Sequence, residues 1–105
     1  MTDLEITRLC AEAMGLEIVS TQDSREIWIR LGNGPVACLY CPLQDDAQAM
    51  ALVKRFEMFI KPVANKEWWV SQCAPEHEVA TGLGSDLNRA ICECAANRQD
   101  AKMLR

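Results

Sequence analysis

Histidine and positive charge are both scarce in this chain of 105 residues. The single histidine is His77, so any Ser-His, Cys-His or His-metal mechanism would have to use that residue. Eleven Lys and Arg residues stand against fifteen Asp and Glu residues, and the formal net charge is -4. Because proteins that bind duplexes obtain much of their affinity by neutralising phosphates, we do not expect nucleic acid as a partner.

Long apolar runs are absent too. No stretch approaches the ~20 apolar residues that a bilayer-spanning helix needs, so we expect no membrane segment. The first residues, MTDLEITRLC, are acidic and amphipathic and hold no basic region followed by an apolar run. We therefore expect no secretory signal and a location in the cytoplasm.

The chain does hold enough apolar material for one core. Half of its residues are hydrophobic and a quarter are charged, which is typical of globular rather than disordered proteins. Its length suffices for a single modest core and is too short for two. We predict one domain over residues 1–105.

Six cysteines are many for a chain of this size. Without a signal peptide, they are expected to be reduced and to fill space in the core. Cys38 and Cys41 form a CxxC, but a thioredoxin-like role requires the first cysteine at a helix N-terminus. Residues three apart on a strand also point to opposite faces, and Asp45 and Asp46 would raise a nearby thiol pKa rather than lower it.

Three helices are predicted. The clearest covers residues 45–62, where apolar residues recur at three- and four-residue steps up to the proline that closes the range. Another covers residues 2–14, where Thr2 and Glu5 have the spacing of an N-terminal capping box, and is followed by Gly15, a residue suited to a left-handed cap. The third begins at the N-cap Ser85, and its end, residues 97–105, is expected to fray.

Alternation of apolar and polar residues predicts the strands. In one of them, Ile27 and Ile29 point one way while Trp28 and Arg30 point the other. Turn residues between the strands, Asn33-Gly34 included, favour hairpins, and glycines at positions 82 and 84 end the last strand. The predicted strands are residues 16–20, 25–31, 36–41, 66–73 and 78–81. We therefore predict an α+β fold, in which a mostly antiparallel sheet of four to five strands and three helices form an α-β-α sandwich.

The tryptophans favour a binding role. Trp28 lies on the polar side of its strand beside Arg30, and Trp68 is adjacent to Trp69, so one ring of that pair faces the core and the other faces out. Exposed aromatic residues near arginine are typical of protein interfaces. The candidate interface residues are Trp28, Arg30 and Trp68, and the alternative is that a helix layer covers these rings.

Four segments resemble the phage ABA-sandwich domain family, which groups small proteins of bacteriophages and prophages. They are the helix end AEAMG at 11–15, the strand that ends in Pro42 and leads through Asp45-Asp46 into the apolar helix, the tryptophan-bearing strand, and LNRAIC at 87–92. The resemblance implies an α-β-α sandwich and a phage origin. It implies no established activity and supplies no catalytic residue.

The favoured function is that of a small phage or prophage accessory protein in the cytoplasm of a bacterial host. We expect it to bind a host or phage protein, with inhibition of a host defence system as one such role. No catalytic residue, cofactor or metal is predicted, and the oligomeric state is left open, a homodimer included. The alternatives are a small enzyme or ligand-binding domain that uses Cys73 and His77, which flank a proline turn, and a zinc-stabilised module that adds further cysteines to them.

Overall fold

The structure, a computed structural model, describes residues 1–20, 26–30, 37–73 and 79–103. These residues form three α-helices and two antiparallel sheets of three strands each, so the fold is α+β, as predicted. The predicted Asn33-Gly34 turn and the turn around His77 lie outside the described residues.

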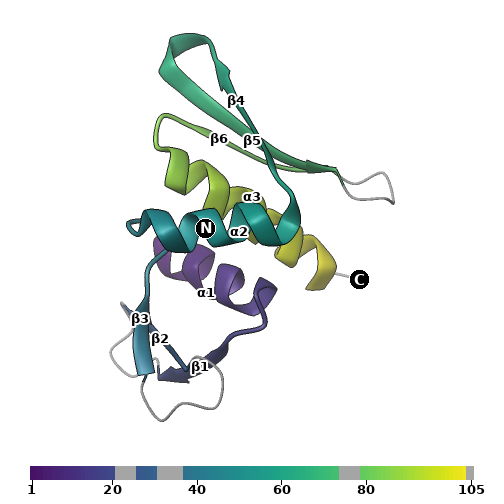
Figure 1. The fold of residues 1–105 in the computed structure, drawn as a ribbon. Coiled ribbons are helices and arrows are strands. Elements are labelled where there is room, and N and C mark those ends of the chain that lie inside the picture. Colours follow the sequence, from purple (N-terminus) through teal and green to yellow (C-terminus); the bar gives the residue numbers. More distant parts are fainter. Residues whose placement is uncertain (21–25, 31–36, 74–78, 104–105) are drawn as a thin grey trace.

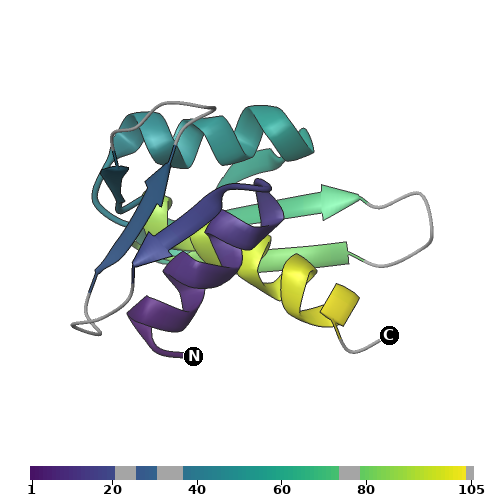
Figure 2. The ribbon, with the colours of Figure 1, turned by 90° about the horizontal axis from the view of Figure 1, so that it is seen from below.

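The helices lie between the two sheets (Figure 1). Figure 2 views the molecule from below, along the direction in which these layers are stacked. The helices are α1 (Asp3–Ala13), α2 (Asp46–Phe56) and α3 (Leu87–Met103). One sheet has the order β1-β2-β3, formed by Glu17–Ser20, Ile27–Arg30 and Ala37–Tyr40. The other has the order β4-β5-β6, formed by Phe59–Val63, Glu67–Cys73 and Val79–Gly84.

The prediction of one sheet with four to five strands is therefore wrong. The described strands form two sheets of three, and the layers run sheet, helices, sheet instead of helix, sheet, helix. The cause is the end of α2. The predicted helix over residues 45–62 stops at Phe56, and residues 59–63 form the additional strand β4, which pairs with β5.

Glu57 ends α2 by turning left-handed, with φ 51° and ψ 52°, and its N–H donates to the carbonyl of Val53. Glycine usually occupies this kind of C-terminal cap. Because the residue here is a glutamate, the sequence did not indicate that the helix ends at this point. Pro62 then lies in the edge strand β4, opposite Trp68 of β5. An edge strand tolerates proline because no neighbour on its outer side needs the missing N–H.

Helix α1 follows its predicted signals closely. The Thr2 hydroxyl accepts a hydrogen bond from the Glu5 N–H at 3.1 Å, as expected for an N-cap. After the helix, Gly15 has a φ of 71°, which a glycine adopts without strain. Both predictions for this segment are confirmed.

Helix α3 differs from its prediction at both ends. The Asp86 carboxylate, not the Ser85 hydroxyl, accepts the capping hydrogen bond from the Arg89 N–H, at 3.3 Å. At the other end, residues 97–103, where fraying was expected, continue the helix to Met103. None of the helices in the described ranges has the length and hydrophobicity to cross a membrane.

The core is built around α3. This helix packs against β5 and β6 on one side and against α1 and α2 on the other. Its buried residues are mostly small: Ala90, Ile91, Cys92, Cys94, Ala95 and Ala96. Larger side chains from the surrounding elements, such as Ile6, Leu52 and Val70, are fully buried around it. Each of these three contributes about 1.5–3 kcal/mol by leaving water.

Gly82 allows α3 to lie directly on β6. A Cβ added at Gly82 would overlap the carbonyl oxygen of Ala90 in α3, whereas a Cβ added at Gly84 would meet nothing within 4 Å. Gly82 lies inside β6 and Gly84 is its last residue, so the prediction that the strand ends before Gly82 is wrong. The first marks a close approach of a helix to the sheet, which is another common use of a strand glycine.

These two glycines give a matched pair of variants. Gly82→Ala should lower the free energy of unfolding by about 1–3 kcal/mol or more, because the helix must move away from the sheet. Gly84→Ala should change it by less than about 1 kcal/mol. Urea denaturation measures the free energy of unfolding of both variants. Equal effects of the two substitutions would contradict the close contact between α3 and β6 at Gly82.

Candidate functional surfaces and a cleft

Three cysteines are buried in the core. Cys10 of α1 donates from Sγ to the carbonyl oxygen of Cys92 in α3, at 3.4 Å. A hydrogen bond between the side chains of Cys10 and Cys92 and then burial raise the pKa of the Cys92 thiol, and burial raises the pKa of Cys94 to about 11. Because the thiolate is the reactive form of cysteine, Cys92 and Cys94 are poor nucleophiles at neutral pH. They fill space in the core, as predicted.

The CxxC cysteines differ in position. Cys38 lies on the inner side of β3 and packs against the core, opposite the buried Ile29. Cys41 follows the strand, and its N–H donates to Gln48 Oε1 at 2.7 Å. Burial, and then the charges of Asp45 and Glu26, raise the pKa of the Cys41 thiol. The predicted effect of Asp45 on a nearby thiol is confirmed.

Within the described ranges, no group of three His, Cys, Asp or Glu residues is placed to hold a metal ion. The side chains of Cys73 and His77 lie outside the described residues. The alternatives that use these two residues, a small enzyme or a zinc-stabilised module, therefore stay predictions.

Trp28 and Arg30 lie on the outer side of β2, as predicted. Trp28 is 38% exposed, whereas its neighbours Ile27 and Ile29 are 1% and 2% exposed. Arg30 forms an ion pair with Glu17 of β1, with 3.5 Å between Nη1 and Oε1. Leu39 of β3 lies opposite Trp28 in the register and is 37% exposed. We call these four residues, Glu17, Trp28, Arg30 and Leu39, the Trp28 face.

Trp68 does not belong to this surface. It lies in the other sheet, and its side chain packs against the core. Trp69 is on the opposite side of β5, in one row with the exposed Lys61 and Leu83. The prediction that one of the adjacent tryptophans faces in and the other out therefore agrees with the structure, and the outward residue is Trp69. The structure does not bring Trp28, Arg30 and Trp68 together.

The outer side of the β4-β5-β6 sheet is a second exposed apolar surface. Phe59 is 63% exposed and Leu83 is 54% exposed. Val70 of the middle strand is fully buried and faces the core. Phe59 and Leu83 lie at the alternate positions of the register, so they face away from the core. Sequence reasoning missed this surface because it assigned Phe59 to a helix.

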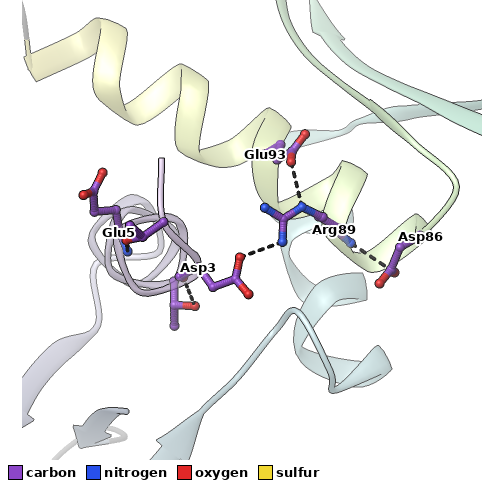
Figure 3. A network of polar contacts seen from close by, with 7 residues as sticks. Asp3, Glu5, Asp86, Arg89 and Glu93 are labelled. Carbon is purple, nitrogen blue, oxygen red and sulfur yellow. Dashed lines mark hydrogen bonds and ion pairs between the residues drawn. The ribbon is translucent and has the colours of Figure 1, made fainter. Parts of the chain in front are cut away.

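Arg89 links α1 to α3 through the exposed carboxylate of Asp3 and the partly exposed carboxylate of Glu93 (Figure 3). Its Nη1 lies 2.7 Å from Asp3 Oδ1, and its Nε lies 3.0 Å from Glu93 Oε1. The hydrogen bond with Asp3 raises the pKa of Arg89. Because these groups are exposed, each pair contributes only about 0.2–1 kcal/mol, and the network has a structural role.

A cleft of about 300 Å³ opens between the start of α1, the start of β2 and the segment after β3. Its lining includes Asp3, Leu4, Thr7, Glu26, Ile27, Leu39, Tyr40, Cys41, Leu43 and Gln44. We call it the α1–β3 cleft. These residues come from three separate parts of the chain, so no local sequence pattern signals it.

A scan of the chain against models of protein families and a search of curated proteins found no match.

The raised pKa of Cys41 predicts slow alkylation. At pH 8, iodoacetamide should modify Cys41 more slowly than free cysteine, because a smaller fraction is thiolate. Asp45→Asn keeps a good N-cap and removes one negative charge, so it should shift the alkylation profile of Cys41 to lower pH. Mass spectrometry of single-cysteine variants checks both results. A half-maximal rate below about pH 8.5, the ordinary cysteine pKa, would contradict the structure.

Tyr40 offers a test of the core. Its hydroxyl is buried without a hydrogen-bond partner in the described part of the chain, and burial raises its pKa. Tyr40→Phe should leave the free energy of unfolding unchanged or raise it by up to about 1 kcal/mol, because an unsatisfied polar group leaves the core. Thermal denaturation measures the change. A loss of more than about 1 kcal/mol would show that the hydroxyl has a partner.

Proposed function

We propose that this chain is a small phage or prophage accessory protein that binds a host or phage protein and performs no catalysis. The proposed location is the cytoplasm of the bacterial host, where inhibition of a defence system is one role for such a protein.

The Trp28 face carries the proposal. It combines an exposed tryptophan, an exposed leucine beside it and an arginine that forms an exposed ion pair with Glu17. Tryptophan and arginine are enriched among the residues that dominate binding energy in protein interfaces. An exposed ion pair is worth little, so Arg30 can exchange Glu17 for a carboxylate of a partner at small cost.

The edges formed by β3, β4 and β6 favour a partner that binds on a sheet face over one that adds a strand. Gln48 caps the edge of β3, since its Nε2 donates to the Leu39 carbonyl at 3.2 Å and its Oε1 accepts from the Cys41 N–H. Asn97 of α3 donates to the Thr81 carbonyl of β6 at 2.8 Å. On β4, the edge position Pro62 has no N–H to offer. Side-chain caps and proline are common protections of exposed sheet edges.

The raised pKa values of Cys41, Cys92 and Cys94 support the non-catalytic part of the proposal, because they disfavour thiolate chemistry. The phage origin rests on the four segments that resemble the phage ABA-sandwich domain family. Two of them, residues 11–15 and 87–92, lie at the end of α1 and the start of α3. The layer order seen here differs from the α-β-α order that the resemblance implies, so the fold does not support the proposed origin.

Affinity capture from bacterial lysate tests the function. Wild-type protein and Phe59→Ala should retain the same partner, and Trp28→Ala should lose it. Truncation of a central interface tryptophan costs about 2 kcal/mol or more, which weakens binding roughly 30-fold. Phe59→Ala is the control, because it removes an exposed aromatic side chain, more exposed than that of Trp28, from the other sheet.

Two outcomes would contradict the proposal. Capture that survives Trp28→Ala and is lost with Phe59→Ala would move the interface to the other sheet. Absence of any specific partner for the wild-type protein, across lysates of candidate hosts, would remove the support for a binding function.

A further inference from the structure

The α1–β3 cleft lies beside the Trp28 face. Leu39 belongs to both, since it lines the cleft and lies opposite Trp28 across the two strands. A partner that covers the Trp28 face therefore comes close enough to place one of its side chains in the cleft. The rest of the lining indicates which kind of side chain fits there.

The size of the cleft suits a single side chain or a small molecule. Its volume of about 300 Å³ is at the lower end of the ~300–1,000 Å³ of typical ligand pockets. Leu4, Ile27 and Leu43 supply apolar walls that can cover a chain of methylene groups. A longer peptide segment does not fit.

The charge of the lining is negative. Asp3 and Glu26 contribute carboxylates, and no lysine or arginine is among the described residues that line the cleft. Arg89 partly neutralises Asp3 through its contact at 2.7 Å, whereas Glu26 is exposed at the start of β2. The charge of Glu26 acts on the lining of the cleft, because it contributes to the raised pKa of Cys41, one of the lining residues.

We propose that the α1–β3 cleft binds an alkylammonium group, and that the partner of the Trp28 face supplies it as a lysine side chain. In this arrangement Leu4 and Leu43 pack along the methylene stem, and Glu26 receives the ammonium group. The source of the lysine rests on the proposed function. The binding chemistry of the cleft does not, so the two can be tested separately.

Small probes test the cleft without any partner. N-acetyl-lysine N-methylamide should cause saturable shifts in the amide NMR signals of Thr7, Leu39 and Leu43. N-acetyl-norleucine N-methylamide has the same stem with no charge and should bind about two- to fivefold more weakly, the range that one ion pair at a partly exposed site produces. Equal binding of the two probes, or no saturable shifts at these residues, would overturn the proposal.

Charge reversal at the cleft supplies the matched variants. Glu26→Lys should abolish the preference for the lysine probe, because it places an ammonium group at the rim. Glu67→Lys makes the same change in net charge on β5, in the other sheet, and should preserve the preference. Amide spectra of both variants show whether the fold is kept. Loss of the preference in both variants would show that it depends on the net charge of the protein and not on a specific site in the cleft.

The source of the ammonium group is tested with the captured partner. Acetylation of the partner's lysines should weaken its capture by the wild-type protein and leave the residual capture by Glu26→Lys unchanged. If the lysine probe binds the cleft and acetylation has no effect on capture, the cleft binds a free amine and the assignment to a partner lysine is wrong. If capture fails altogether while the probe binds, the proposed function fails and the cleft remains an alkylammonium site.

Discussion

The contact between α3 and β6 is the constraint on which the rest of this structure depends. Gly82 has no side chain, so the backbone of α3 at Ala90 lies directly against the strand. The buried side of α3 is made mostly of alanine and cysteine, which lets α1 and α2 approach from the opposite side. One helix is thereby enclosed, and the two sheets are held on opposite sides of the helical layer (Figure 1).

This arrangement determines which surfaces are available for function. Each sheet uses one side to cover the helices, so its other side faces outward and carries the exposed aromatic residue of that sheet, Trp28 or Phe59. Cys10, Cys92 and Cys94, by contrast, are buried in the core, and burial raises the pKa of the Cys92 and Cys94 thiols. The two exposed sheet faces offer apolar contact and charge.

The sequence predicted the individual elements better than their assembly. The caps of α1 and the alternation in β2 are local patterns, and both are confirmed. The end of α2 could not be foreseen, because Glu57 takes a left-handed conformation that its residue type does not favour, and the apolar spacing of the helix continues into Phe59–Val63. That one error hid a strand, and with it the second sheet. The α1–β3 cleft was hidden for a different reason, since segments far apart in the sequence build it.

Nuclear Overhauser effects in a labelled sample test the central claim, two sheets separated by a helical layer, most directly. The account predicts close contacts from the Gly82 α-protons to Ala90 of α3, and cross-strand contacts within each set of three strands. It also predicts none between β2 and β5. Cross-strand contacts that join β1, β2 or β3 to β4, β5 or β6 in one continuous sheet would contradict it.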